Sequence, residues 1–230
     1  MPIQTPRTRT AFDHSLQTVQ DDLLRLGSML DAAISRAIQA MANSDGALAR
    51  HVVVDDGDIN ALRFKIEEAC LRLIATQQPA ARDLRTIVAA FSIVSDMERM
   101  ADHAAGIAKT VISMGSEPPI LPLDEIPHMA DECRAMLHTA LDAYIRHDVD
   151  LARTLPKRDY VVDALYERLF HLVVTTIAET PSASTRALYL LFAAHNLERI
   201  GDRAVNIAER VIFITSGEMK ELNAGPDAPL

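Results

Sequence analysis

The sequence predicts an all-α protein made of two tandem three-helix bundles, with six long helices and a pseudo-two-fold internal repeat. Apolar residues recur at steps of three or four along long segments, as one buried helical stripe requires. A proline-rich stretch divides these segments into two groups of three. A segment of the first group also returns in the second, one hundred residues later.

Composition agrees with a helical globular protein and excludes several classes. The 230 residues are 49% hydrophobic and 24% charged, and only 8 Gly and 4% aromatic residues favour helix over strand. A net charge of −9 argues against a nucleic-acid binder and is compatible with cation binding. No apolar run is long enough to span a membrane, and Cys70 and Cys133 lie in apolar helical stretches. We therefore expect a cytoplasmic protein.

The first bundle is expected over residues 12–114, after a disordered tail at 1–11. Its first helix begins at Phe12, and residues 43–46 supply a turn and an N-cap. Pro79 marks the break between the next two helices. The second and third helices are expected at about Ala47–Gln77 and Ala80–Met114.

Residues 115–127, which contain four of the eleven prolines, are expected to be a connector. The second bundle follows at 128–217, with a C-terminal tail at 218–230. Pro156 is expected to kink or break its second helix. The three helices are expected at about 128–147, 148–179 and 183–216.

The internal repeat is the strongest signal in the sequence. Residues 98–112 read ERMADHAAGIAKTVI and residues 198–212 read ERIGDRAVNIAERVI, with the same residue at eight of fifteen positions. A weaker match relates residues 56–62 to residues 159–165, at a slightly different offset that a loop could absorb. Each half therefore repeats the same polar residues on corresponding helices, which indicates duplication.

The repeated polar residues form four pairs, each spaced four residues apart on one helical face. They are Asp56 with Asn60, Glu98 with Asp102, Asp159 with Asp163, and Glu198 with Asp202. Consecutive antiparallel helices can bring two such pairs together, giving one oxygen-rich cluster per half that suits magnesium, manganese, iron or zinc. The arginine after each glutamate points about 100° away and could brace the bundle. The alternative is a solvated acidic face with salt bridges to Arg99, Arg199 and Arg203.

These motifs resemble a known family. Glu98 to His103 and Leu197 to Asp202 resemble the paired E/D-x-x-x-D signature of the PhoU proteins, and the resemblance extends from about Phe12 to Ser216. It implies a cytoplasmic two-bundle protein that negatively regulates the phosphate-starvation response and phosphate uptake. The implied partners are a phosphate-sensing, PhoR-like histidine kinase and the PstB-like ATPase of a phosphate ABC transporter, so that the membrane is reached only through partners.

The resemblance also implies divalent or multinuclear metal on the acidic motifs. The first cluster would use Asp56, Asn60, Glu98 and Asp102, and the second Asp159, Asp163, Glu198 and Asp202, assisted by Asn206 and Glu209. Two departures matter: Asn60 is a weaker ligand than a carboxylate, and Ala101 and Gly106 stand where the second half has Gly201 and Asn206. We therefore expect the second site to bind metal more tightly.

Two other functions compete with this interpretation. A ferritin-like di-iron enzyme needs two E-x-x-H motifs on inward helical faces, and the chain has one, Glu125 to His128, in the expected connector with a proline inside it. No phosphate-binding loop or nucleophile elbow is present, so we expect no enzyme. A metal-independent helical adaptor for other partners shares the predicted fold. A homodimer is expected because an open acidic cluster can be shared between chains.

Overall fold

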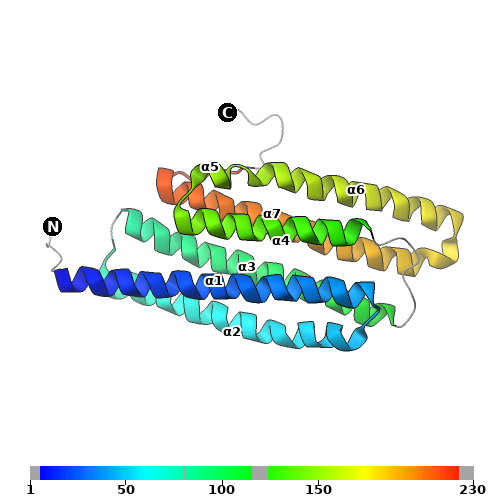
Figure 1. Ribbon diagram of the computed structural model, residues 1–230, viewed down its shortest axis with the longest axis horizontal. Coiled ribbons are helices and arrows are strands. Elements are labelled where there is room, and N and C mark those ends of the chain that lie inside the picture. Colours follow the sequence, from blue (N-terminus) through cyan, green and yellow to red (C-terminus); the bar gives the residue numbers. More distant parts are fainter. Residues whose placement is uncertain (1–5, 80, 116–123, 223–230) are drawn as a thin grey trace.

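The computed structural model describes residues 6–79, 81–115 and 124–222, and within them the protein is helical, with no strand. The long helices run along one axis of the molecule (Figure 1). Their bounds are α1 Pro6–Ala42, α2 Gly46–Gln77, α3 Arg82–Met114, α4 Glu125–Arg146, α6 Leu155–Glu179 and α7 Ser184–Ser216. Two short turns, α5 Val149–Ala152 and η1 Pro181–Ala183, complete the described chain. The predicted all-α fold with six long helices is confirmed.

Several helix ends differ from the predicted ones, and prolines explain three of them. α1 begins at Pro6, within the expected tail, and α4 begins at Glu125, within the expected connector, so that Pro127 lies in its first turn. The fifth predicted helix is divided into α5 and α6, and Pro156 again occupies a first turn. The amide of a residue in the first turn has no partner inside the helix, so proline costs little there.

The turn between α1 and α2 has the predicted chemistry. Ser44 has a positive φ of 51°, and the Asp45 carboxylate accepts hydrogen bonds from the backbone N–H groups of Ala47 and Leu48, both at 2.9 Å. These bonds satisfy two donors at the start of α2 that have no partner within the helix.

Each half of the chain forms a bundle, and the two bundles pack side by side. α1, α2 and α3 contact one another, as do α4, α6 and α7. The pairs α3–α7 and α1–α4 join the halves. The helices α2, α3, α7 and α6 therefore form one layer, which α1 and α4 cover. The turn between α2 and α3 and the turn between α6 and α7 lie at opposite ends of the molecule (Figure 1). The core consists mainly of aliphatic side chains from all six long helices, together with Phe12, Tyr144 and several sulfur-containing side chains.

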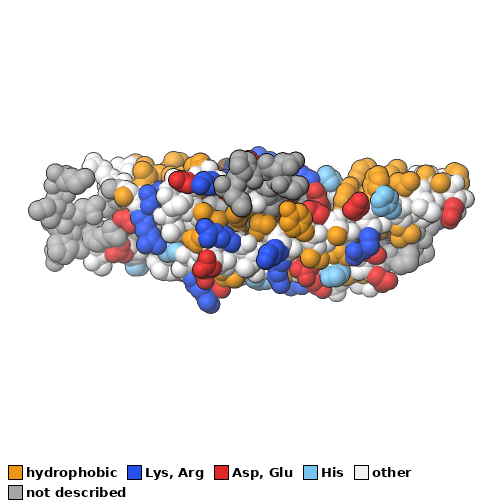
Figure 2. All heavy atoms as spheres, turned by 90° about the horizontal axis from the view of Figure 1, so that it is seen from above, with side chains coloured by type: hydrophobic (Ala, Val, Ile, Leu, Met, Phe, Trp, Pro, Cys, Tyr) orange, Lys and Arg blue, Asp and Glu red, His pale blue; other side chains and the backbone are white. Residues whose placement is uncertain are grey.

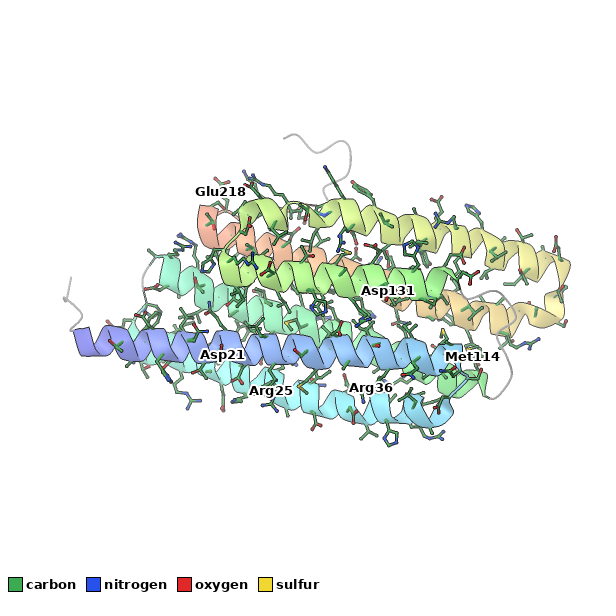
Figure 3. The ribbon with its side chains drawn as sticks, in the orientation of Figure 1. Asp21, Arg25, Arg36, Met114, Asp131 and Glu218 are labelled. Atoms are coloured by element: carbon green, nitrogen blue, oxygen red, sulfur yellow. The ribbon has the colours of Figure 1, made fainter. Side chains whose placement is uncertain are left out.

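Ion pairs hold neighbouring helices together at the surface of this core. Arg36 of α1 faces α2 (Figure 3), and its guanidinium lies 2.5 Å from the Asp55 carboxylate. Between the halves, Arg134 of α4 donates to both carboxylate oxygens of Asp31 of α1, at 2.8 and 3.0 Å. Bidentate pairs of this kind fix orientation as well as distance.

The contacts between α3 and α7 are reciprocal, as an internal two-fold axis requires. Asp96 of α3 accepts hydrogen bonds from Arg203 and Asn206 of α7, both at 3.3 Å. The residue one hundred positions after Asp96, Asn196, lies 3.0 Å from the ring nitrogen of His103, which stands one hundred positions before Arg203. The duplication seen in the sequence is therefore also a symmetry of the packing.

Candidate functional site

The first acidic cluster lies between α2 and α3. Asp56 is partly buried, and the Asn60 amide one turn later donates to its carboxylate at 3.3 Å. Burial raises the pKa of Asp56, and the negative charges of Asp102 and Glu98 raise it further, although Lys109 opposes them. The carboxyl group of Asp56 on α2 is therefore close enough to Glu98 and Asp102 of α3 for their charges to raise its pKa. The two pairs thus face each other across the helices.

An arginine that the sequence argument missed braces this cluster. Arg63 of α2 donates to Glu67 at 2.9 Å and to Glu98 of α3 at 3.1 Å. The hydrogen bond to Glu67 is the main reason why the pKa of Arg63 is raised. The spacing of Arg63 and Glu67, four residues apart on one helix, is the signal from which half of this arrangement could have been predicted.

The second acidic cluster lies between α6 and α7. Burial raises the pKa of Asp163, and the charges of Glu198 and Asp202 raise it further, against the effect of Arg199. Arg199 makes an ion pair with both α7 acids, Glu198 and, at 3.0 Å, Asp202. We expected this arginine to point away from the acids; instead its long side chain bends back over them, because the nearest negative charge is theirs. His195 also lies 3.6 Å from Glu198.

Asp159 occupies a deeper position than its counterpart Asp56. It is 3% exposed, and a Cβ atom added to Gly201 would lie 2.8 Å from its Oδ1 atom. Glycine at this position therefore lets the α6 carboxylate approach the α7 backbone. The first half has Ala101 at the equivalent place, and there Asp56 is only partly buried.

Asn206 and Glu209, expected to assist the second cluster, have other contacts. The Asn206 amide donates to Asp96 of α3 at 3.3 Å, and Glu209 accepts a hydrogen bond from the backbone N–H of Leu222 at 2.9 Å. Both line an open pocket of about 530 Å³ that begins beside Asp202. They extend the polar face of α7 beyond the acids.

The donor set suits a divalent cation, whereas the side-chain positions are not those of a closed metal site. Within the described residues, no three His, Cys, Asp or Glu side chains come close enough to hold a metal ion. Arg63 and Arg199 compensate part of the negative charge instead. Yet Oδ1 of Asp56 is buried without a hydrogen-bond partner, which is an oxygen available to a ligand. Side chains would have to turn before a cation could take several oxygens.

The protein is a duplicated helical protein, with two tandem bundles and one acidic cluster in each. Comparison with known proteins identifies the family to which it belongs. The family model described as "PhoU domain" matches twice, at residues 23–111 and 126–211, once in each bundle. The chain belongs to the PhoU family, and the resemblance inferred from the sequence motifs is confirmed.

The chain is similar to its relatives along nearly its whole length. It is 36% identical to a Clostridium acetobutylicum protein named "Phosphate-specific transport system accessory protein PhoU homolog", over 94% of this chain and 99% of the relative. The crystal structure of PhoU from Pseudomonas aeruginosa superposes with a TM-score of 0.86 at 36% identity, covering 90% of this chain and 100% of that one. For the phosphate transport system regulatory protein PhoU from Streptococcus pneumoniae, the TM-score is 0.85 at 30% identity, covering 91% and 99%. Every helix in the described part of the chain is too short or too polar to span a membrane.

Proposed function

We propose that this protein is a cytoplasmic, non-enzymatic accessory of a phosphate-specific transport system. In this role it links the ATPase subunit of the transporter to a phosphate-sensing histidine kinase and keeps the phosphate-starvation response off when phosphate is abundant. The observation that supports the proposal is the similarity to relatives named as accessory or regulatory proteins of phosphate transport, which spans both bundles. The long helices suit a protein that acts by contact.

Deletion of the gene tests this function directly. We expect phosphate-responsive genes to stay on in high phosphate in the deletion strain, and repression to return when the wild-type gene is restored on a plasmid. A deletion strain that represses these genes normally, with no second copy of the gene in the genome, contradicts the proposal. A variant protein that no longer binds the kinase but still represses these genes would contradict the kinase link alone.

The same proposal includes divalent cation binding at the two acidic clusters. Carboxylates facing each other across a helix pair repel, and a cation would take the place that Arg63 and Arg199 now fill. We expect the second cluster to bind more tightly, because it has Asp163 where the first has the neutral Asn60. The ligands would be Asp56, Asn60, Glu98 and Asp102 in the first cluster, and Asp159, Asp163, Glu198 and Asp202 in the second.

Metal analysis of protein purified without a histidine tag tests the cation sites. Manganese titrated into Asp102→Ala and Asp202→Ala separately should show the larger loss of bound metal for Asp202→Ala. A larger loss for Asp102→Ala contradicts the ranking of the sites. If neither the wild type nor the variants bind metal, the chain is the metal-independent adaptor. The homodimer expected from the open acidic clusters is tested by light scattering with and without manganese, where a monomer under both conditions rejects it.

A further inference from the structure

An open pocket lies beside α7, beyond the second acidic cluster. Its volume is about 530 Å³, which is in the range of pockets that hold small molecules. Its lining comes from residues 202–210 of α7 and from residues 219–221, which follow the helix. The segment after the helix is anchored at Leu222, whose backbone N–H donates to Glu209 at 2.9 Å and whose side chain packs against the core. The fold itself therefore builds both walls of the pocket.

Two arginines that line the pocket have hydrogen-bond donors without an acceptor. The Nε atoms of Arg203 and Arg210 are buried and have no hydrogen-bond partner within the described residues. A buried donor in this state is rare in native proteins, because it has lost its hydrogen bond to water without gaining another. The two side chains are still 31% and 24% exposed, so a turn of each guanidinium group can present its donors to a ligand. Two such donors beside one pocket point to an occupant with acceptor oxygens.

The spacing and the contacts of these two arginines suit a shared ligand. They are seven residues apart, so they lie on the same face of α7 and about 10 Å apart along its axis. One guanidinium nitrogen of Arg203 lies 3.3 Å from Asp96, and one of Arg210 lies 3.8 Å from Glu209, which is beyond hydrogen-bond distance. Each guanidinium group carries five N–H donors. Because arginine side chains are long, both groups can converge on one ligand in the pocket.

The duplication shows that this pair of arginines is a feature of the second half alone. One hundred residues before Arg203 and Arg210, the first half has His103 and Thr110. The two halves share the acids of the repeat and the aliphatic core of α3 and α7, so packing of the bundle does not require the arginines. They therefore indicate a role that only the second half has.

The charges around the pocket indicate the class of its ligand. The charged residues that line it are Arg203, Arg210, Lys220, Asp202, Glu209 and Glu221. Guanidinium groups bind phosphoryl oxygens through strong, charge-assisted hydrogen bonds. The carboxylates would repel a small free anion, but they accept hydrogen bonds from hydroxyl and amino groups. On the face of the molecule that Figure 2 shows, Lys and Arg side chains likewise lie among Asp and Glu, which does not favour a polyanion such as nucleic acid.

We propose that this pocket binds a small phosphorylated metabolite. Its phosphoryl group would lie between Arg203 and Arg210, and its hydroxyl or amino groups would face the carboxylates of the lining. Lys220, on the opposite wall, would add a third positive charge near the phosphoryl group. The site goes beyond the proposed function, because it requires neither a bound metal nor the partners proposed above.

Calorimetry with the full chain in metal-free buffer tests the pocket with four probes. AMP and ribose 5-phosphate carry a phosphoryl group and hydroxyl groups, inorganic phosphate carries the phosphate oxygens alone, and adenosine lacks the phosphoryl group. Arg210→Gln removes one guanidinium group from the pocket, and Lys220→Gln removes the ammonium group of the opposite wall. Arg168→Gln is the matched control, because it removes an exposed arginine of α6 that does not line the pocket. Circular dichroism checks that each variant is folded.

We expect AMP or ribose 5-phosphate to bind the wild type and the Arg168→Gln control equally well, and adenosine not to bind. Arg210→Gln should bind the phosphorylated probe about tenfold more weakly, because charge-assisted hydrogen bonds are lost, and Lys220→Gln about threefold. A folded Arg210→Gln that binds as tightly as the wild type overturns the site, as does a wild type that binds no phosphorylated probe. Inorganic phosphate that binds as tightly as AMP overturns the role of the carboxylates, and adenosine that does so overturns the role of the phosphoryl group.

Discussion

Replacement of Arg63 by methionine tests whether an arginine holds the first acidic cluster together. Methionine keeps an unbranched stem on α2 but removes the hydrogen bonds to Glu67 at 2.9 Å and Glu98 at 3.1 Å. The three side chains are only 14–24% exposed, so the ion pairs are partly shielded from solvent. Hydrogen bonds to charged groups contribute about 1.5–3 kcal/mol each when buried, and exposed ion pairs about 0–1 kcal/mol. We expect the free energy of unfolding to fall by about 1–2 kcal/mol.

Thermal denaturation in metal-free buffer measures this loss. A protein of this size loses about 2–4 °C in Tm for each kcal/mol, so Arg63→Met should lower Tm by about 2–8 °C. Arg72→Met is the matched control, because Arg72 pairs with Glu68 on the same helix at the same spacing, but at 3.8 Å and with both side chains at least 70% exposed. Its effect should stay below about 0.5 kcal/mol. Manganese should also stabilise Arg63→Met more than the wild type, because one more carboxylate is available to the cation.

Equal changes in Tm for the two variants would refute this reasoning, since burial and geometry would then not distinguish the two arginines. If Arg63→Met loses the expected stability but manganese stabilises it no more than the wild type, Arg63 stabilises the cluster but does not compete with a cation.

Three further predictions follow from the packing. Asp31→Asn should lower the free energy of unfolding by about 1–2 kcal/mol at pH 7. The hydrogen bonds from Arg134 lower the pKa of Asp31, so this stabilisation is fully present above the unfolded pKa of about 3.9 and is lost as the pH falls through the lower folded pKa. Urea unfolding at acidic pH should therefore give the wild type and the variant the same stability. Gly201→Val should cost about 1–3 kcal/mol in urea unfolding, because the added atoms meet Asp159, and an unchanged midpoint would contradict the close approach of α6 and α7. Tyr144→Phe should raise stability by about 1 kcal/mol, because the Tyr144 hydroxyl is buried without a hydrogen-bond partner; a loss of stability would reveal a partner for it.

The sequence predicted the helices well and their ends less well. Long amphipathic stripes, such as the one from Leu23 to Met41, leave no other way to bury so many apolar side chains. Proline was the source of the errors, since Pro6, Pro127 and Pro156 all lie in first turns. A proline in the sequence excludes a helix interior but is compatible with both a helix start and a connector, and only the surrounding packing decides between them.

For the acidic clusters, the facing of the pairs could be predicted and the role of the arginines could not. Two pairs at the same spacing on consecutive antiparallel helices approach each other if the register is right, and in the first half Arg63 of α2 reaches Glu98 of α3 at 3.1 Å. The direction of a flexible side chain such as Arg199 depends on charges brought close by the fold. The use of Gly201 likewise becomes visible only when α6 is placed against α7.

Anomalous diffraction at the manganese edge, from crystals of the tag-free protein grown with manganese, tests most directly whether carboxylates of neighbouring helices meet to bind a cation once in each half. We expect two peaks per chain, one between Asp56 and Glu98 and a stronger one between Asp163 and Glu198. Crystals that show no peak at either place, or manganese bound only elsewhere on the surface, would contradict the account.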